Sequence, residues 1–191
     1  EINEWSGSVL IAGILEETIE SQINLFNTII KDTFLRQRFK EAKFEGKKNQ
    51  KLSIEPFEKS IKKIVFVGLG KAEALQIDDL RKAASIGTHQ VFGYERKIGI
   101  SFPWYAFDPS SVASAVGEAV RLSSLKDFRF KSEPKESTSI EEVDLIGLAI
   151  KSTEIAISEI NPICEGVKFA RELVAAPPNF LTPSQMAKEA E

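Results

Sequence analysis

Short apolar runs alternate along this chain with segments whose apolar residues recur at helical spacing. The clearest run, IVFV at residues 64–67, is β-branched or aromatic throughout and is typical of a central strand. Further strands are expected at residues 8–15, 52–55, 98–102 and 143–150. Strands alternating with amphipathic helices predict an α/β fold in three layers, with helices on both faces of a sheet. The sheet should be mixed, because residues 52–55 and 64–67 are joined by too little chain for a helical crossover.

The intervening segments are expected to be helices. One begins near Ile19, a second covers residues 77–93, and a third begins after the N-cap Asp108. A fourth covers residues 152–175, where Pro162 either kinks it or starts a fresh helix. The residues expected to face inward are Ile23, Phe26, Ile30 and Phe34 in the first, Leu80, Ala84, Gly87 and Val91 in the second, Val112, Val116, Ala119 and Leu122 in the third, and Ala156, Ile160, Ile163, Val167, Ala170 and Val174 in the fourth.

The chain ends with ARELVAAPPNFLTPSQMAKEAE. Its double proline ends the fourth helix, and Thr182, Pro183 and Gln185 form a capping box that begins another. Such a short helix without a partner is marginal in water. The sequence also opens on Glu1 rather than methionine. We therefore expect a fragment of a larger protein.

Composition narrows the possible function classes. A chain of 191 residues can form one full domain, and its net charge is −3. With a pI of about 5.5, it has no overall basic character that would attract nucleic acid or a membrane. No apolar run approaches the roughly 18 residues that span a bilayer. Cys164 is the only cysteine, which excludes an internal disulfide and fits a reducing cytoplasm.

Charge is unevenly distributed, and one run is basic. From Arg36 to Lys51 the chain has seven basic and two acidic residues. The run could bind an anion or nucleic acid, or it could be a solvated helix end that continues into a loop. We favour the second interpretation, because no interleaved aromatic residues suggest stacking on bases.

Residues that could carry chemistry are sparse and scattered. The acidic pairs 16–17, 78–79 and 141–142 are adjacent in sequence, so their side chains point to different faces and form no metal clamp. They are interpreted as caps, turns or surface residues, and residues 78–79 suit the first turn of their helix. His89 falls off its helix's apolar stripe and should be partly exposed, while Cys164 should be a packing residue. We therefore assign no catalytic, cofactor-binding or metal-binding residue.

Two further motifs are ambiguous. GLGK at residues 68–71 follows a strand and precedes a helix, where glycine turns can bind phosphate. Ala72 and Glu73 break the P-loop and dinucleotide patterns, so a tight turn is favoured. The aromatic cluster of Phe102, Trp104, Tyr105 and Phe107 could stack a ligand, but is more typical of the end of a sheet or a domain seam.

Three segments resemble one known family, the leucyl aminopeptidases (cytosol aminopeptidases). ARELVAAPPNFLTP at residues 170–183 is similar to the segment that opens that family's catalytic domain. FEGKKNQ at residues 44–50 and VFVGLGK at residues 65–71 resemble a loop and a strand-to-helix turn upstream of it. The order and spacing also fit, so the resemblance covers essentially the whole chain. Asn49 stands where the family usually has glycine, but asparagine tolerates a left-handed backbone.

The resemblance implies a non-catalytic N-terminal domain with a macro-domain-like α/β/α fold over residues 1–150. An interdomain connector helix would follow at residues 151–176, and the start of the catalytic domain at residues 177–191. In this family, two divalent metal ions (manganese or zinc) and the catalytic lysine and arginine belong to the downstream domain. The parent would be a cytoplasmic homohexamer that removes N-terminal residues, often leucine, from peptides. This part would serve assembly and access control and be inactive alone.

Two alternatives remain at this stage. A macro-like fold with a glycine turn could be a stand-alone module that binds a nucleotide or ADP-ribose, although the turn lacks a phosphate fingerprint. The basic run from Arg36 to Lys51 could bind nucleic acid, although the net charge of the chain is negative.

Overall fold

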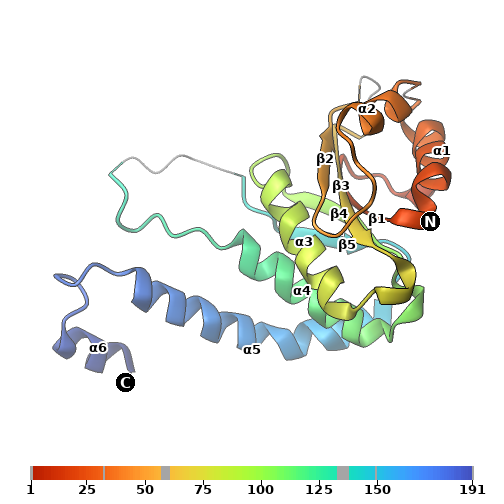
Figure 1. The fold of residues 1–191 in the computed structure, drawn as a ribbon. Helices are drawn as coiled ribbons and strands as arrows, with labels where there is room; N and C mark the ends of the chain where they lie inside the picture. Colours follow the sequence, from red (N-terminus) through yellow and green to blue (C-terminus); the bar gives the residue numbers. More distant parts are fainter. Residues whose placement is uncertain (1, 32, 57–60, 133–137, 149, 191) are drawn as a thin grey trace.

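The computed structural model describes the whole chain except residues 1, 32, 57–60, 133–137, 149 and 191. Within this part, five strands form one sheet in the order β2-β3-β1-β4-β5 (Figure 1). The strands are β1 (Val9–Leu15), β2 (Lys51–Ile54), β3 (Lys63–Gly70), β4 (Lys97–Ser101) and β5 (Glu142–Leu145). Only β2 runs antiparallel to its neighbour, so the predicted mixed sheet is confirmed.

Helices cover both faces of the sheet, as the alternating pattern predicted. The core on one face is closed by α3 (Ile77–Val91) and α4 (Pro109–Ser124). The core on the other face is closed by α1 (Ile19–Ile30) and α2 (Leu35–Glu41). All eight residues of β3 are buried, because this strand is covered on both sides. A strand buried on both faces has a continuous apolar sequence, which explains why IVFV gave the clearest strand signal.

The long helix α5 (Ile150–Ala175) packs beside α4 and then extends away from the sheet (Figure 1). Pro162 lies inside it, so the helix is not divided there. Ala156, Ile160 and Cys164 are its buried residues against the domain. A Cβ atom on Gly117 of α4 would lie 2.9 Å from Cδ1 of Ile160, so glycine permits the close packing of the two helices. The short helix α6 (Pro183–Ala190) follows at the far end.

Several boundaries and faces differ from the sequence prediction. Phe34 is 63% exposed, because α1 ends at Ile30 and Lys31 adopts a left-handed conformation with φ of 50°. The strand expected at residues 143–150 ends at Leu145, where a turn containing Gly147 (φ 87°) leads into α5. On α4, Leu122 was expected to face inward, but it is only partly buried.

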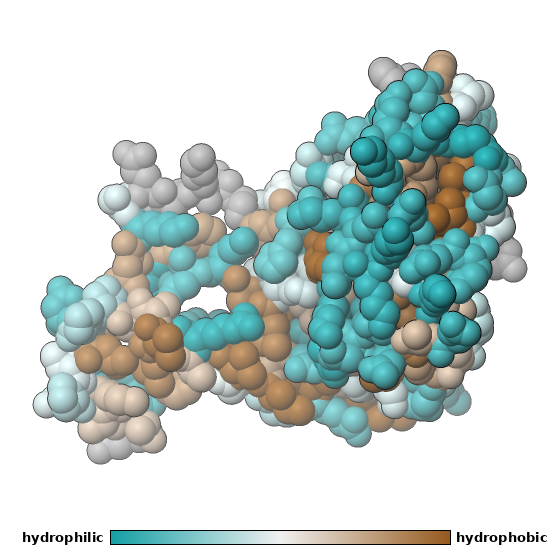
Figure 2. Space-filling view, viewed as in Figure 1, coloured by the Kyte–Doolittle hydropathy of each residue, from teal (hydrophilic) through white to brown (hydrophobic). Residues whose placement is uncertain are grey.

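The inward face expected for the fourth helix is also partly wrong. Ile163 and Val174 were placed on its apolar stripe, yet they are 57% and 87% exposed. Figure 2 shows apolar residues gathered along α5, whereas most of the visible globular part is hydrophilic. The large apolar residues exposed on α5, α6 and the segment between them are Ile155, Ile157, Ile163, Phe169, Val174, Phe180 and Met186, which we call the α5–α6 apolar face.

Candidate functional site

Two of the segments singled out in the sequence lie against each other. The loop at residues 44–50 crosses the carboxyl end of β3, where the backbone N–H of Gly68 donates to the carbonyl of Gln50 at 2.8 Å. The N–H of Asn49 donates to the carbonyl of Gly68 at 3.0 Å, and that of Gly70 to the carbonyl of Gly46 at 2.8 Å. The loop therefore continues the pairing of β2 with β3 and is fixed by its own backbone.

The conformation of this loop depends on residues with little steric bulk. A Cβ atom on Gly68 would lie 2.1 Å from the carbonyl oxygen of Lys47, a distance that real atoms do not adopt. Asn49 has a φ of 67°, which confirms that asparagine preserves the left-handed turn. The side chain of Gln50 closes the loop, since its Oε1 accepts from the N–H groups of Glu45 (2.8 Å) and Lys47 (3.1 Å).

The two lysines within this loop, Lys47 and Lys48, are each paired with an acidic side chain. Nζ of Lys48 lies 2.7 Å from Oδ2 of Asp79 and donates to the carbonyl of Ala74 at 3.3 Å. Lys47 pairs with Glu45 at 2.5 Å, and this hydrogen bond raises the pKa of the lysine and lowers that of the glutamate.

The glycine turn leads into no free helix N-terminus. The strand β3 continues through Gly70, and a short 3-10 helix (Ala72–Ala74) precedes α3. Gln76 and Asp79 then form a capping box, in which the Asp79 carboxylate accepts from the backbone N–H of Gln76 at 2.9 Å. Residues 68–70 are therefore part of β3, and the tight turn expected at residues 68–71 is wrong. The start of α3 is already capped by a carboxylate, which disfavours phosphate binding there.

Five of the six residues in the acidic pairs have basic or backbone partners. Asp78 contacts Lys82 at 2.8 Å and Arg81 at 2.9 Å, and these hydrogen bonds lower its pKa. Glu141 and Glu142 pair with Arg96 and Lys97 at 3.0 and 2.6 Å. Glu17 accepts from the N–H of Ala72 at 3.3 Å. Among the described residues, no three His, Cys, Asp or Glu side chains converge where they could hold a metal ion.

His89 and Cys164 lie where the sequence placed them. His89 is exposed on α3. Cys164 is 1% exposed between α5 and the domain, and burial raises the pKa of its thiol. A buried thiol with a raised pKa is a poor nucleophile, so the packing interpretation of Cys164 is confirmed.

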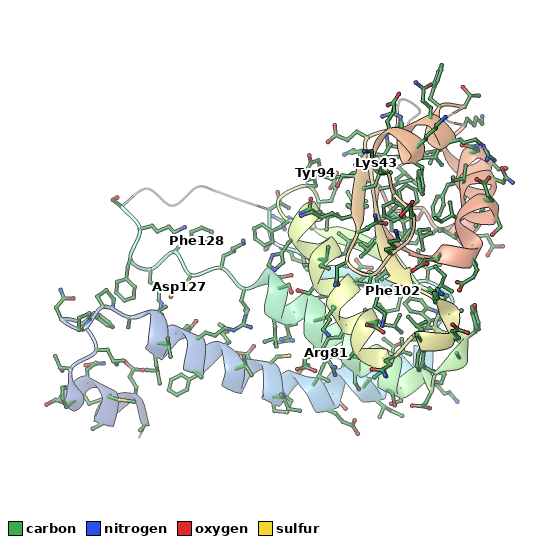
Figure 3. All side chains as sticks on the ribbon, in the orientation of Figure 1. Lys43, Arg81, Tyr94, Phe102, Asp127 and Phe128 are labelled. Atoms are coloured by element: carbon green, nitrogen blue, oxygen red, sulfur yellow. The ribbon has the colours of Figure 1, made fainter. Side chains whose placement is uncertain are left out.

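The aromatic cluster divides into buried and exposed members. Phe102 and Trp104 are buried at the carboxyl end of β4, with ring centroids 5.9 Å apart, and Phe107 packs against the same core. Phe102, labelled in Figure 3, comes directly after β4. These three rings fill the end of the sheet, as expected. Tyr105 is 81% exposed and contributes nothing to that core.

The basic run does not form a continuous unpaired patch. Arg36 pairs with Glu20 on α1, while Lys47 and Lys48 pair with Glu45 and Asp79. These contacts agree with a solvated helix end followed by a loop. Contrary to the expectation from the sequence, two aromatic residues do lie within the run, Phe39 and Phe44, but both are buried and cannot stack on bases.

Sequence reasoning missed the polar contacts that fix α5 along the domain. Arg121 of α4 donates to Asn161 at 2.6 Å and to Glu165 at 2.7 Å. Arg129 binds Asp127 at 2.7 Å and the carbonyl of Glu172 at 2.7 Å. Asp127 is labelled in Figure 3 beside the distal half of α5. Long-range pairs of this kind leave no periodic signal in a sequence.

Comparison with known proteins places this arrangement in a family. The family described as the cytosol aminopeptidase family, N-terminal domain, matches residues 13–134. A probable cytosol aminopeptidase from Prochlorococcus marinus is 46% identical over 187 residues, which cover 98% of this chain and 38% of the relative. A probable cytosol aminopeptidase from Synechococcus sp. is 36% identical over 190 residues, which cover 97% of this chain and 37% of the relative. The chain thus spans less than two fifths of the length of these relatives.

Solved structures show the same fold. A tomato leucine aminopeptidase variant superposes with a TM-score of 0.83 at 26% identity, over 100% of this chain and 39% of its own. A bottromycin maturation enzyme in complex with Mn superposes with a TM-score of 0.68 at 20% identity, over 95% of this chain and 35% of its own, a likeness of fold alone. From the family match and these relatives, the chain belongs to the cytosol aminopeptidase family, whose N-terminal domain it contains.

Proposed function

We propose that this chain is the non-catalytic N-terminal part of a leucyl aminopeptidase-like metallo-exopeptidase. Residues 1–150 form the N-terminal domain, residues 151–176 the connector, and residues 177–191 the start of a catalytic domain. The parent enzyme releases N-terminal amino acids, often leucine, from peptides. Its chemistry belongs to the larger share of the relatives' length that this chain does not match.

The α5–α6 apolar face is the observation that supports this proposal. Val174 is 87% exposed, and Ile163 and Phe180 are more than half exposed. Large exposed apolar patches mark interaction surfaces, because their exposure to water is unfavourable. Ile157 also lines a cavity of about 430 Å³ between α4, α5 and the segment before β5. The occupant we propose is the catalytic domain of the same polypeptide, since the patch continues into α6.

The polar contacts of α5 support a rigid connector. Arg121 and Arg129 attach the helix to the domain at two separate levels along its length. Arg171 adds a third attachment, donating to the carbonyl of Leu122 at 2.8 Å. A helix fixed in this way holds the catalytic domain at a defined position relative to the sheet. Such a domain can narrow access to an active site and contribute to assembly into a cytoplasmic homohexamer.

The metal chemistry of the parent is assigned to residues outside this chain. Two divalent ions, Mn or Zn, would polarise the scissile carbonyl and provide a hydroxide nucleophile there. Among the described residues, the acidic pairs do not converge, and five of their six members have basic or backbone partners. They do not fit a dinuclear site, and we assign them no catalytic role.

The two alternative functions, a module that binds a nucleotide or ADP-ribose and a nucleic-acid-binding protein, have less support. The helix that follows the glycine turn is capped by Asp79, which disfavours phosphate binding there. Three basic residues of the run, Arg36, Lys47 and Lys48, are paired with acidic residues. No helix in the described part of the chain is long and apolar enough to cross a membrane. Peptide substrates and the protein's own catalytic domain therefore remain the proposed partners, without a membrane and without nucleic acid.

Hydrolysis of leucine p-nitroanilide tests the proposal. The 191-residue chain and a protein in which it continues to the length of the relatives are assayed with added Mn²⁺ or Zn²⁺. We expect turnover only by the longer protein. Turnover by the 191-residue chain, or none by the longer protein, would contradict the proposal.

A substitution on the α5–α6 apolar face tests the docking step. Val174→Asp places a charge on a residue so exposed that the fold of this chain should not change. In the longer protein we expect lower activity and easier proteolytic cleavage near residue 176. Thr28→Asp, at an exposed position of α1 on the opposite layer, is the matched control. Equal behaviour of the two variants would rule out docking at Val174.

A further inference from the structure

A small crevice opens where the central strands β1 and β4 separate. Their pairing ends at Ala12 and Ser101, while β1 continues to Leu15 beside β3. After β1 the chain enters α1 on one face of the sheet, and after β4 it enters α4 on the other face. In open α/β sheets, such a reversal creates a crevice at the carboxyl ends of the strands, where ligands commonly bind.

The crevice holds a cavity of about 240 Å³. One wall is α1, with Gln22, Leu25 and Phe26, and the other contains Ser101 and Phe102 at the end of β4. The cavity is smaller than the roughly 300 Å³ at which pockets for drug-sized ligands begin. Its size suits one small molecule comparable to a single heteroaromatic ring system.

The polar groups in the crevice are free to bind a ligand. Gln22 and Ser101 are both partly buried, and neither side chain has a hydrogen-bond partner among the described residues. The carboxamide of Gln22 and the hydroxyl of Ser101 together offer donors and acceptors that can form hydrogen bonds with the edge of a planar heterocycle. Thr18 also lines the cavity, but its hydroxyl already donates to the carbonyl of Leu15 at 3.3 Å.

The charges and rings of the crevice narrow the ligand class. Among the described residues, no Lys, Arg, Asp or Glu lines it, so a phosphate or carboxylate would lose hydration without gaining a partner from them. The rings of Phe26 and Phe102 belong to its apolar walls. Tyr105, 81% exposed, lies at the crevice and has no hydrogen bond or ring contact to another described residue, so its ring can move onto a ligand.

We propose that the crevice between β1 and β4 binds an uncharged heteroaromatic molecule of nucleobase size. Gln22 and Ser101 hydrogen-bond the edge of the ring system, and Tyr105 covers its face. This site lies in the sheet domain, away from the α5–α6 apolar face. It does not depend on the proposed peptidase function.

Titration of the ¹⁵N-labelled chain with adenine tests this site, with AMP as the charged comparison. We expect adenine to shift the amide signals of Gly13, Ser101 and Phe102, and AMP to bind at least tenfold more weakly. Absence of shifts with adenine, or shifts confined to other residues, would overturn the site. Equal or tighter binding of AMP would overturn the assignment of an uncharged ligand.

Variants make the test specific. Gln22→Leu removes the amide from the crevice, and Tyr105→Ala removes an exposed ring with no effect expected on folding. Each should weaken adenine binding at least fivefold. Gln90→Leu on α3 makes the same change as Gln22→Leu on the other side of the sheet and should leave binding unchanged. Undiminished binding by Tyr105→Ala and Gln22→Leu would contradict the proposal.

Discussion

Replacing Gly68 by alanine tests the packing of the loop at residues 44–50 on β3. The new Cβ atom would meet the carbonyl oxygen of Lys47 at 2.1 Å and the backbone of Gly46 at 2.8 Å. Both neighbours are backbone atoms, so no side-chain rotation can relieve the contact. The loop would have to move away from the strand.

The expected loss follows from the hydrogen bonds that would break. Three join this loop to Gly68 and Gly70, at 2.8, 3.0 and 2.8 Å. A backbone hydrogen bond contributes about 0.5–1.5 kcal/mol net, so their loss costs about 2–4 kcal/mol. Alanine in place of glycine in a strand otherwise gains about 0.5–1 kcal/mol, because glycine loses more entropy on folding. Taking the middle of each range, the net prediction is a destabilisation of about 2–3 kcal/mol.

Urea unfolding followed by circular dichroism measures this change. We expect a lower midpoint with an unchanged m-value, and a Tm lowered by about 4–12 °C for a chain of this size. Hydrogen exchange at the amide of Gly70 should also accelerate, because that N–H donates to Gly46. Gly166→Ala on α5 is the matched control, since no atom lies within 4 Å of its new Cβ.

The control separates contact from intrinsic propensity. Gly166→Ala should stabilise the chain by up to about 1 kcal/mol, as expected for glycine in a helix. A loss below about 1 kcal/mol for Gly68→Ala would refute the close approach of the loop and the strand. If Gly68→Ala and Gly166→Ala changed the free energy of unfolding equally, the change would be explained by backbone entropy alone.

Three further outcomes are expected. Asn49→Gly should stay within about 0.5 kcal/mol of the parent in urea unfolding, whereas Asn49→Val should lose about 1–2 kcal/mol, because the φ of 67° is strained for a β-branched residue. Cys164, 1% exposed with its thiol pKa raised by burial, should react with DTNB about 100-fold more slowly in the native chain than in urea; equal rates would contradict its packing. Hydrogen bonds from Arg129 lower the pKa of Asp127 from 3.8 to about 2. The ionised Asp127 carboxylate therefore contributes fully to stability above about pH 4, and this contribution is lost as the pH falls through about 2. Carboxyl NMR should show a titration midpoint of about 2 for Asp127, and Arg129→Ala should return the midpoint toward 3.8.

The sheet could be predicted from the sequence because its central strands are buried on both faces. Ile64 and Phe66 enter one core and Val65 and Val67 the other, so every position is apolar. The fourth helix was harder to interpret, because its apolar residues surround it. Ala156, Ile160 and Cys164 face the domain, while Ile155 and Ile163 face solvent. A helix with apolar residues on several sides has no single stripe from which its inward face can be read.

The order of strands and the crevice between β1 and β4 had no counterpart in the sequence pattern. Gln22 and Ser101 are ordinary residues in their own segments, and only the placement of β4 beside β1 brings them to one cavity. The arginine contacts of α5 are of the same kind, since Arg121 and Glu165 are 44 residues apart in sequence. Local periodicity specifies which residues are buried, but it does not specify which distant elements become neighbours.

Two of the three segments behind the family resemblance, residues 44–50 and 65–71, pack against each other in this chain. The glycines of GLGK look like parts of a phosphate site, yet Gly68 lacks a side chain because the backbone of Lys47 passes too close for a Cβ atom. The helix that follows is already capped by Asp79. Lys48 completes the arrangement by joining the loop to that capping carboxylate at 2.7 Å. The two glycines of the motif are thus explained by the close approach of the loop to the strand end. A short glycine-lysine motif therefore does not by itself identify a reaction, and the functional assignment has to come from the residues that a structure brings together.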